Sequence, residues 1–230
     1  MSYMNDPVEF AKTHLAVNNV VSILISSEFL QMESLLDICF DFVVRHLNQV
    51  VKQPVDLSCL SSNVLDRIAR SLSERAMDSL RDKKDKIMSR LYSHKLSQLL
   101  EDDDNILYRC LYCSKLFTSP QREYMTCAHA KHFVDFHGNV IAKHTADNYW
   151  DIRRYVQYLH DDVGIAWRNL YWSMWGRIQS FHCSHCDTQF PVAEYAHCSH
   201  HPGEPVFKAG ANIGVYVCLR TISSFEFFVI

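Results

Sequence analysis

A pattern of cysteines and histidines occurs twice in this 230-residue chain, and it constrains the fold more than any other feature. Each copy begins with Cys-x-x-Cys, continues with a Phe after three residues, and ends with Tyr-x-x-Cys-x-His. The cysteines are Cys110, Cys113 and Cys127 in the first copy and Cys183, Cys186 and Cys198 in the second. Cys-x-x-Cys places two thiolates on one tight turn, and a distant Cys/His pair completes a tetrahedron around zinc. The sequence therefore predicts two zinc sites.

The histidine that closes each site has two candidates in each copy. They are His129 and His132 after Cys127, and His200 and His201 after Cys198. The repeat favours His129 and His200, because Cys-x-His is the element that both copies share. Four protein ligands leave no open position for water, which is typical of structural zinc, and the Phe and Tyr of each copy are expected to pack beneath the metal. Four other histidines are interpreted as surface residues or as supports for a ligand: His137, His144, His185 and His197.

Composition narrows the class of protein further. With 48% hydrophobic residues the chain can form real cores, and a net charge of -3 gives no overall attraction to nucleic acid. The nine cysteines are an odd number, and six of them belong to the two copies, which disfavours a secreted disulfide framework and favours a reducing compartment, nucleus or cytosol. No apolar run reaches about 18 residues, so no membrane span is expected.

Residues 1–55 have the periodicity of two packed helices. A first helix, with Asn18 or Asn19 as its N-cap, carries one apolar face, and a second follows after almost no loop. The residues on the two faces are Val20, Ile23, Leu24 and Ser27, and then Leu35, Leu36, Cys39, Phe40, Val43 and Leu47. Cys39 lies on the apolar face and is expected to be an inert core thiol.

Residues 56–105 are expected to form a helical connector. Ser62 or Asn63 would cap a short helix, and one longer helix would follow it. The apolar positions are Val64, Ile68 and Leu72 in the first helix and Ala76, Leu80, Ile87, Leu91 and Leu99 in the second. The mixed charges of 81–86 are typical of a solvated face, and the acidic run 101–104 predicts the boundary before the zinc module.

Residues 106–216 contain both copies and an aromatic segment with all four tryptophans. Asp147 would cap a helix that runs to Leu159, and a second helix over about 163–179 would present an aromatic stripe. We expect this pair to pack between the two zinc sites. The predicted fold is thus mainly α with small zinc-stabilised β/loop modules, and residues 217–230 form an atypical apolar tail.

The stretch from Asn19 to Cys39, NVVSILISSEFLQMESLLDIC, resembles the C-terminal helical hairpin of BTB/POZ domains. The resemblance covers roughly residues 8–50 and implies a protein-interaction hairpin. The resemblance implies that the chain begins in the middle of such a domain, without the first half that carries the mixed sheet and most of the dimer interface. We therefore expect either a truncated form or a hairpin that works without its usual partner surface, and the missing half disfavours BTB self-association.

A second resemblance concerns residues 198–207, CSHHPGEPVF, which are similar to the core of CHORD-type zinc domains. That resemblance implies that His201, the histidine before Pro-Gly, is the ligand. A CHORD module continues to a Cys-Cys pair, whereas here Cys218 is followed by Leu219 and an apolar end. The family pattern breaks at that point. A broken motif followed by an abrupt apolar terminus is typical of an alternative splice end.

Together, the hairpin, the charged connector and the Cys/His module resemble a family of nuclear BTB-containing adaptors that restrain immunoglobulin class switch recombination. The resemblance implies a non-enzymatic nuclear adaptor with corepressor-type protein partners. The sequence itself holds no His-Glu-x-x-His, phosphate loop or nucleophile elbow. The alternative is a ubiquitin-ligase component, either a RING-like ligase with Asp135 as its eighth ligand or a BTB cullin adaptor. Direct nucleic-acid binding is not expected, because no helix after a metal knuckle concentrates Lys and Arg.

Overall fold

A computed structural model describes residues 9, 13–138, 141–184 and 187–195, and the backbone of residues 140, 206–207 and 214–215. This part of the chain is mainly helical, as predicted, and its strands pair into two-stranded antiparallel hairpins. The helices of more than one turn are α2 Val20–Phe29, α3 Glu33–Val50, α4 Ser62–Ser71, α5 Glu74–Ser79, α6 Met88–Glu101, α8 Ile152–Asp161 and α9 Trp167–Ile178. The shorter elements are η2 Asp103–Asn105, β1 Leu107–Arg109, β2 Leu116–Thr118, α7 Gln121–Tyr124, β3 Phe133–Val134, β4 Val140–Ile141, β5 Ser180–His182, β6 Gln189–Pro191, η3 Val192–Glu194, β7 Val206–Phe207 and β8 Gly214–Val215.

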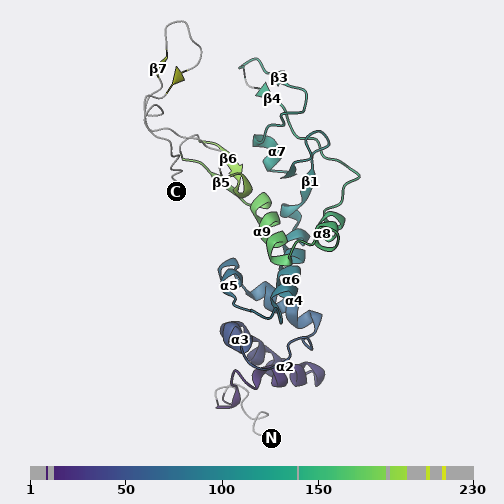
Figure 1. The fold of residues 1–230 in the computed structure, drawn as a ribbon, viewed down its shortest axis with the longest axis vertical. Coiled ribbons are helices and arrows are strands. Elements are labelled where there is room, and N and C mark those ends of the chain that lie inside the picture. Colours follow the sequence, from purple (N-terminus) through teal and green to yellow (C-terminus); the bar gives the residue numbers. More distant parts are fainter. Residues whose placement is uncertain are drawn as a thin grey trace.

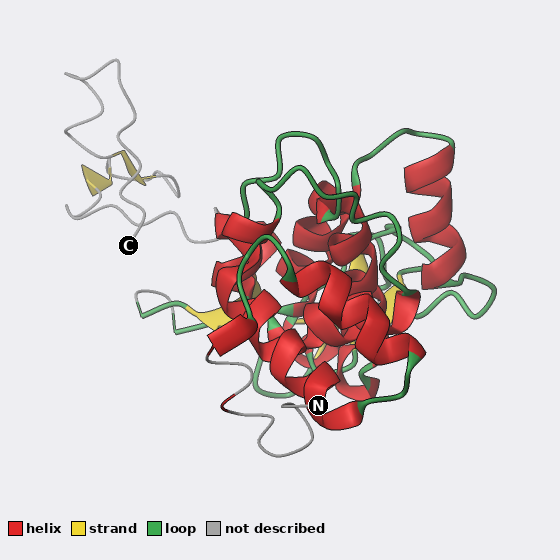
Figure 2. Ribbon diagram, turned by 90° about the horizontal axis from the view of Figure 1, so that it is seen from below, coloured by secondary structure: helices red, strands yellow, loops and turns green. Residues whose placement is uncertain are grey.

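The elements succeed one another along the molecule. α2 and α3 form one end, α4 to α6 the middle, and α8, α9 and the hairpins with β1 and β3 the other end (Figure 1). In a view along the long axis most of the helices overlap, because they follow one another along that axis (Figure 2). One hydrophobic core runs through the helices from Val20 to Ile178.

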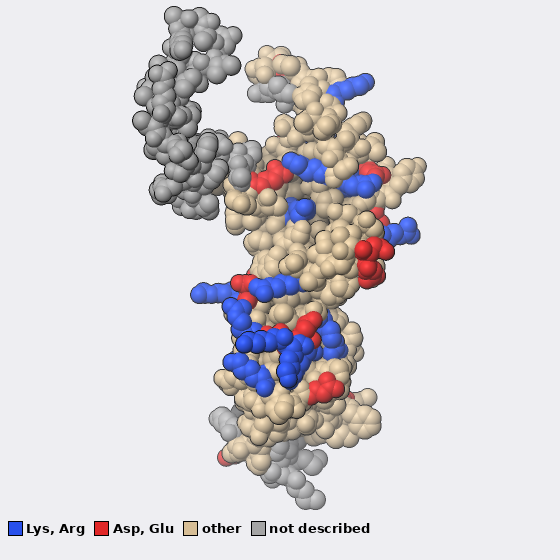
Figure 3. Space-filling view, viewed as in Figure 1, with Lys and Arg blue, Asp and Glu red and all other residues tan. Residues whose placement is uncertain are grey.

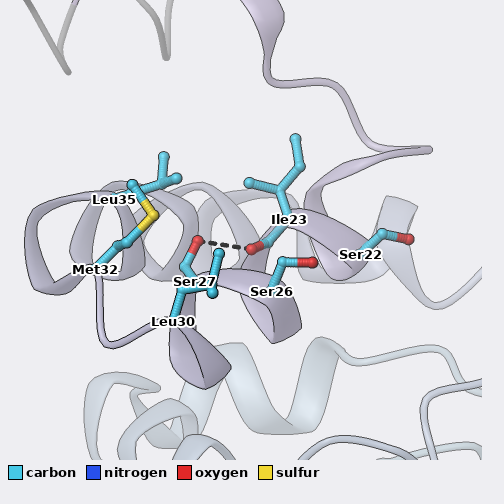
Figure 4. A pocket seen from close by; sticks show the side chains of 7 residues that line it. All are labelled: Ser22, Ile23, Ser26, Ser27, Leu30, Met32 and Leu35. Atoms are coloured by element: carbon cyan, nitrogen blue, oxygen red, sulfur yellow. Dashed lines mark hydrogen bonds between the residues drawn. The ribbon is translucent and has the colours of Figure 1, made fainter. Parts of the chain in front are cut away.

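The expected N-terminal helical pair is present as α2 and α3. A turn at Gln31, whose φ of 54° is left-handed, reverses the chain within three residues. The hydroxyl of Ser27, buried on the predicted face, donates to the carbonyl of Ile23 at 2.6 Å (Figure 4). Asn19 stands at the N-cap position, but its side chain accepts from the backbone N–H of Ala16 and not from the helix.

The connector differs from the prediction in one place, because the longer helix is divided into α5 and α6. Residues 80–87 form a turn in which the carboxylate of Asp82 accepts from the backbone N–H groups of Ile87 and Met88 at 2.9 and 3.2 Å. These bonds satisfy the first donors of α6, and they bury Asp82 where a solvated charge was expected. The preceding cap also shifts by one residue, since Ser61 accepts from the N–H of Val64.

The aromatic segment belongs to the core mainly through α9, and the main partner of that helix is the connector, whereas Tyr149 and Tyr158 are exposed. α9 packs lengthwise on α6, and the rings of Tyr171 and Tyr92, both buried, lie 5.7 Å apart. α8 begins later than expected because Asp151 is the residue that caps it, by accepting from the N–H of Arg154. Asp147 instead binds Arg109 at 2.6 Å.

Charge is unevenly distributed over the surface. Lysine and arginine side chains gather around α5 on the face shown in Figure 3. A hollow beside the turn of residues 80–87 is lined by Lys52, Arg81, Lys83, Lys84 and Lys86 among others. Arg81 and Lys86 are already bonded to backbone carbonyls, so part of this charge supports the fold.

Candidate metal centre

The first Cys-x-x-Cys turn lies at the end of the β1–β2 hairpin. The strands pair with Tyr108 opposite Phe117, and the N–H of Cys110 then donates to the carbonyl of Lys115 at 2.8 Å. The N–H of Ser114 donates back to Cys110 at 2.9 Å, and its left-handed φ of 61° closes the turn. This knuckle holds the thiols of Cys110 and Cys113 close together.

A short extended segment brings a histidine to these thiols. Residues 142–147 lie between the two cysteine segments: the N–H of Cys127 donates to Ala142 at 2.7 Å, and the N–H of Leu111 donates to Thr145 at 2.8 Å. Side chains alternate along an extended chain. Lys143 and Thr145 are accordingly exposed, and His144 between them is buried among the cysteines.

Cys110, Cys113, Cys127 and His144 form one group whose potential ligand atoms all lie within 4.8 Å of one another. The Sγ atoms of Cys110 and Cys127 are 3.8 Å apart, and Cys113 Sγ lies 3.4 Å from His144 Nδ1. Bond lengths of about 2.3 Å to sulfur and about 2.0 Å to nitrogen in a tetrahedron place two sulfurs about 3.8 Å apart and a sulfur and a nitrogen about 3.5 Å apart. The observed separations match those of a zinc site, and 3.8 Å is far too long for a disulfide.

Burial supports the same interpretation. Cys110, Cys127 and His144 are each 1% exposed or less, and the His144 ring stacks on the buried ring of Phe117 with centroids 5.2 Å apart. Among the described residues, His144 Nε2 has no hydrogen-bond partner, and Nδ1 faces a thiol. Nδ1 is therefore the nitrogen in position to bind an ion with the three thiols, and buried thiol and imidazole donors that face one another fit a closed, four-ligand site.

The pKa values of the two knuckle thiols diverge. Burial raises the pKa of Cys110, but bonds from the backbone N–H of Cys113, from His144 and from the N–H groups of Thr145 and Tyr112 outweigh it and lower that pKa to about 6. Burial, reinforced by Cys110, raises the pKa of Cys113 to about 11. Cys110 therefore loses its proton more easily than Cys113, and a bound cation would favour both thiolates.

The structure brings together three of the five first-copy residues that the sequence singled out. His129 and His132 are exposed and do not belong to the group. His144, interpreted from the sequence as a surface or supporting residue, occupies the fourth position. In the sequence, the only sign that His144 faces inward is the alternation of apolar and polar residues around it. The extended segment is too short for that alternation to be recognised.

The second copy is described only in part. Its hairpin of β5 and β6 and the residue Cys183 are described, whereas the other predicted ligands, Cys186, Cys198, His200 and His201, lie outside the described residues. The two hairpins are linked through Gln121, which is buried. Its side-chain oxygen accepts from the N–H of Thr118 at 2.9 Å, and its nitrogen lies 2.6 Å from the carbonyl of Arg177 and 3.1 Å from Ser180 Oγ.

The N-terminal segment is similar to a known protein family. Residues 1–40 match the family described as the BTB domain of SANT and BTB domain regulator of CSR. The matched stretch includes α2 and the first part of α3 and agrees with the BTB resemblance of the hairpin. No solved structure matches the chain. Within the described ranges, every helix is too short or too polar to cross a membrane.

Proposed function

We propose that this protein is a non-enzymatic protein-interaction adaptor whose Cys/His module is held by structural zinc, one ion in each copy of the pattern. The observation that carries the zinc proposal is the buried group of Cys110, Cys113, Cys127 and His144. Three thiols and one imidazole suit zinc, and four protein ligands leave no position for a water or substrate. The ion would stabilise the fold and carry no reaction.

Metal analysis of purified, dialysed protein tests this assignment. His144→Ala should lose one zinc per chain, whereas the matched double variant His129→Ala/His132→Ala should keep the full content. His144→Cys should also retain the ion, because four thiolates form an equally good site. Protein without tightly held metal would refute the zinc proposal, and metal loss in the double variant alone would refute the role of His144.

The adaptor proposal rests on the family match and on the surface of the matched hairpin. At the end of α2, the side chains of Phe29 and Leu30 are 85% and 61% exposed. Leu30 also lines a hollow between α2 and α3 with Ile23, Met32 and Leu35 (Figure 4). Exposed apolar residues beside a concave surface are typical of a protein-binding site. We propose a corepressor-type protein as the partner.

Affinity purification from nuclear extract with quantitative mass spectrometry can test this surface. Phe29→Asp/Leu30→Asp should lose a defined set of corepressor-type proteins, while Lys83→Glu/Lys84→Glu, on the exposed basic turn, should retain them. Equal recovery with both variants would remove the hairpin as the binding site. Circular dichroism must show that both variants remain folded.

The finer proposals follow from the description of the matched family and from the cysteine usage. We propose a nuclear location and a role in restraining immunoglobulin class switch recombination, tested by imaging the full chain and by switching frequency in B cells that lack it. The RING-like alternative is less favoured, since Cys110, Cys113 and Cys127 gather in one local site with His144. Cullin recovered with wild type but not with Phe29→Asp/Leu30→Asp would instead support a cullin adaptor.

A further inference from the structure

The hollow beside the turn of residues 80–87 has two walls that are distant in sequence. Residues 51–54, which follow α3, form one wall, and residues 81–84 with Lys86 form the other. Two contacts hold the walls together. The ammonium group of Lys86 donates to the carbonyls of Gln53 and Val55, and the side-chain oxygen of Asn48 accepts from the N–H of Arg81 at 2.8 Å. The hollow measures about 440 Å³, within the range of ligand-binding pockets.

Positive charge dominates this hollow. Of the nine residues that line it, one is acidic, Asp82, and five are cationic. The five cations are Lys52, Arg81, Lys83, Lys84 and Lys86. They belong to the lysines and arginines that gather around α5 in Figure 3, on a chain whose net charge is -3. Cations held this close repel one another, so an anionic ligand would relieve a repulsion that the free protein carries.

The neighbouring carboxylates are engaged by other groups. Asp82 is 7% exposed and accepts from the backbone N–H groups at the start of α6. Asp56 and Asp85 each accept from the N–H and the hydroxyl of a nearby serine, and Asp78 pairs with an arginine of α9 at 2.6 Å. Within the described ranges, three exposed cations of the hollow make no ion pair or hydrogen bond: Lys52, Lys83 and Lys84.

The hollow is separate from the apolar surface of the hairpin. Phe29 and Leu30 precede α3, whereas Val51 and Lys52 follow it. α3 has 18 residues, and a rise of about 1.5 Å per residue separates its ends by roughly 25 Å. A ligand in the basic hollow and a protein on the hairpin therefore contact different residues.

The chemistry of the lining favours a peptide over a nucleic acid. Single strands are held largely by stacking of their bases on aromatic side chains, and none of the nine described lining residues is aromatic. A duplex calls for cations that follow its phosphates along a stripe, whereas these cations converge on one hollow. An ammonium group is a compact point charge that accepts many approach directions, which suits flexible carboxylate side chains. Val51 and Pro54 add apolar surface for their methylene groups.

We propose that the basic hollow binds an acidic segment of a second protein partner, in which several aspartate or glutamate side chains lie close together. Lys52, Lys83 and Lys84 pair with these carboxylates, while Arg81 and Lys86 hold the two walls in place. The inference goes beyond the proposed adaptor surface, because it adds a ligand class and a site that depend neither on the hairpin nor on zinc.

Fluorescence anisotropy with the full chain and short labelled peptides provides the test. Wild type should bind a glutamate-rich peptide and not the same peptide with glutamine in place of glutamate, and added salt should weaken the binding. Lys83→Glu/Lys84→Glu should lower the affinity about tenfold or more. Lys52→Gln, on the opposite wall, should lower it by a smaller factor. The matched control is Arg153→Glu/Arg154→Glu on the exposed face of α8, which changes the net charge equally and should bind as wild type does.

Three results would overturn the proposal. Equal losses in the two double variants would show that overall charge alone attracts the peptide. Unchanged binding in both Lys83→Glu/Lys84→Glu and Lys52→Gln would place the peptide elsewhere. Labelled DNA that binds wild type more tightly than the peptide, and is lost with the same lysines, would assign the hollow to nucleic acid. Recovery of the hairpin partners with Lys83→Glu/Lys84→Glu is a separate measurement, so failure of this site and failure of the adaptor proposal can be told apart.

Discussion

The helical body and the first Cys/His centre are held together by different forces. The helices share an extended core in which Leu65, Ile68 and Leu91 are fully buried. Around the Cys/His centre, the buried apolar cluster consists of Cys110, Phe117, Met125 and Cys127, two of which are thiols from the proposed site. Nearby apolar side chains point outward, and Phe136 is 92% exposed. Residues 107–147 therefore bury too little to fold by hydrophobic packing alone.

This contrast explains why thiols and imidazole were needed at one end of the molecule and not at the other. A helix with an amphipathic pattern can bury its face against a neighbour and be stable from packing. A hairpin whose strands have only two or three residues cannot be stable from packing, because it has few side chains to bury and its strand edges are unpaired. The proposed metal would join the β1–β2 turn, Cys127 and the His144 segment and so take the place of the missing core.

Metal removal should produce the largest effect and should separate the two regions. Structural zinc contributes about 10–16 kcal/mol in zinc-finger peptides, more than any single packing contact. A strong chelator at neutral pH should abolish hydrogen-exchange protection of the N–H groups of Leu111 and Cys127, while the amides of α3 and α6 stay protected. Lower pH should release the metal as well, since protons compete for thiolates and imidazole. Equal loss of protection in α3 and the metal centre would show that the regions do not differ in this way.

A core truncation should have the second-largest effect, and in the other region. Leu91→Ala, at a fully buried position of α6, is expected to lower the free energy of unfolding by about 2–5 kcal/mol, because it removes packed methylene groups and leaves a cavity. Leu30→Ala, at a position 61% exposed, is the matched control and should change stability by less than about 0.5 kcal/mol. Urea denaturation followed by circular dichroism measures both, and similar costs would contradict the assigned core.

Loss of the contacts at the junction between the two regions should have the third-largest effect on stability. Gln121 joins β2 to the end of α9 through bonds made by both ends of its amide. Gln121→Ala should cost about 1–3 kcal/mol, because the buried N–H of Thr118 and the carbonyl of Arg177 lose a partner. Gln157→Ala on the exposed face of α8 serves as the control. If the two variants have equal stability in urea, Gln121 does not couple the regions.

The sequence predicted the helical body better than it predicted the metal centre. The faces of α2 and α3 follow from a long 3.6-residue period, which survives local errors. The break between α5 and α6 did not follow, because Asp82 acts as a buried acceptor within a run that looks solvated. The three thiols were found because Cys-x-x-Cys is a local motif. His144 was missed because its place depends on pairing with both Leu111 and Cys127, which are distant in sequence.

The smallest effect should come from a surface ion pair within the helical body, between Arg67 of α4 and Asp37 of α3. The two groups are 2.6 Å apart, but their side chains are 45% and 60% exposed, so water and salt weaken the attraction. Asp37→Ala should therefore cost less than about 1 kcal/mol. Arg67→Ala should cost more than Asp37→Ala, because the guanidinium also lies 4.2 Å from the ring centroid of Phe40, a contact that does not need the carboxylate.

A double-mutant cycle in urea at low and high salt separates the contribution of the ion pair from that of the contact with the Phe40 ring. If the coupling between the residues exceeded about 2 kcal/mol, well above the range of exposed pairs, ion pairs as well as the core would have to be counted among the forces that hold the helical body together.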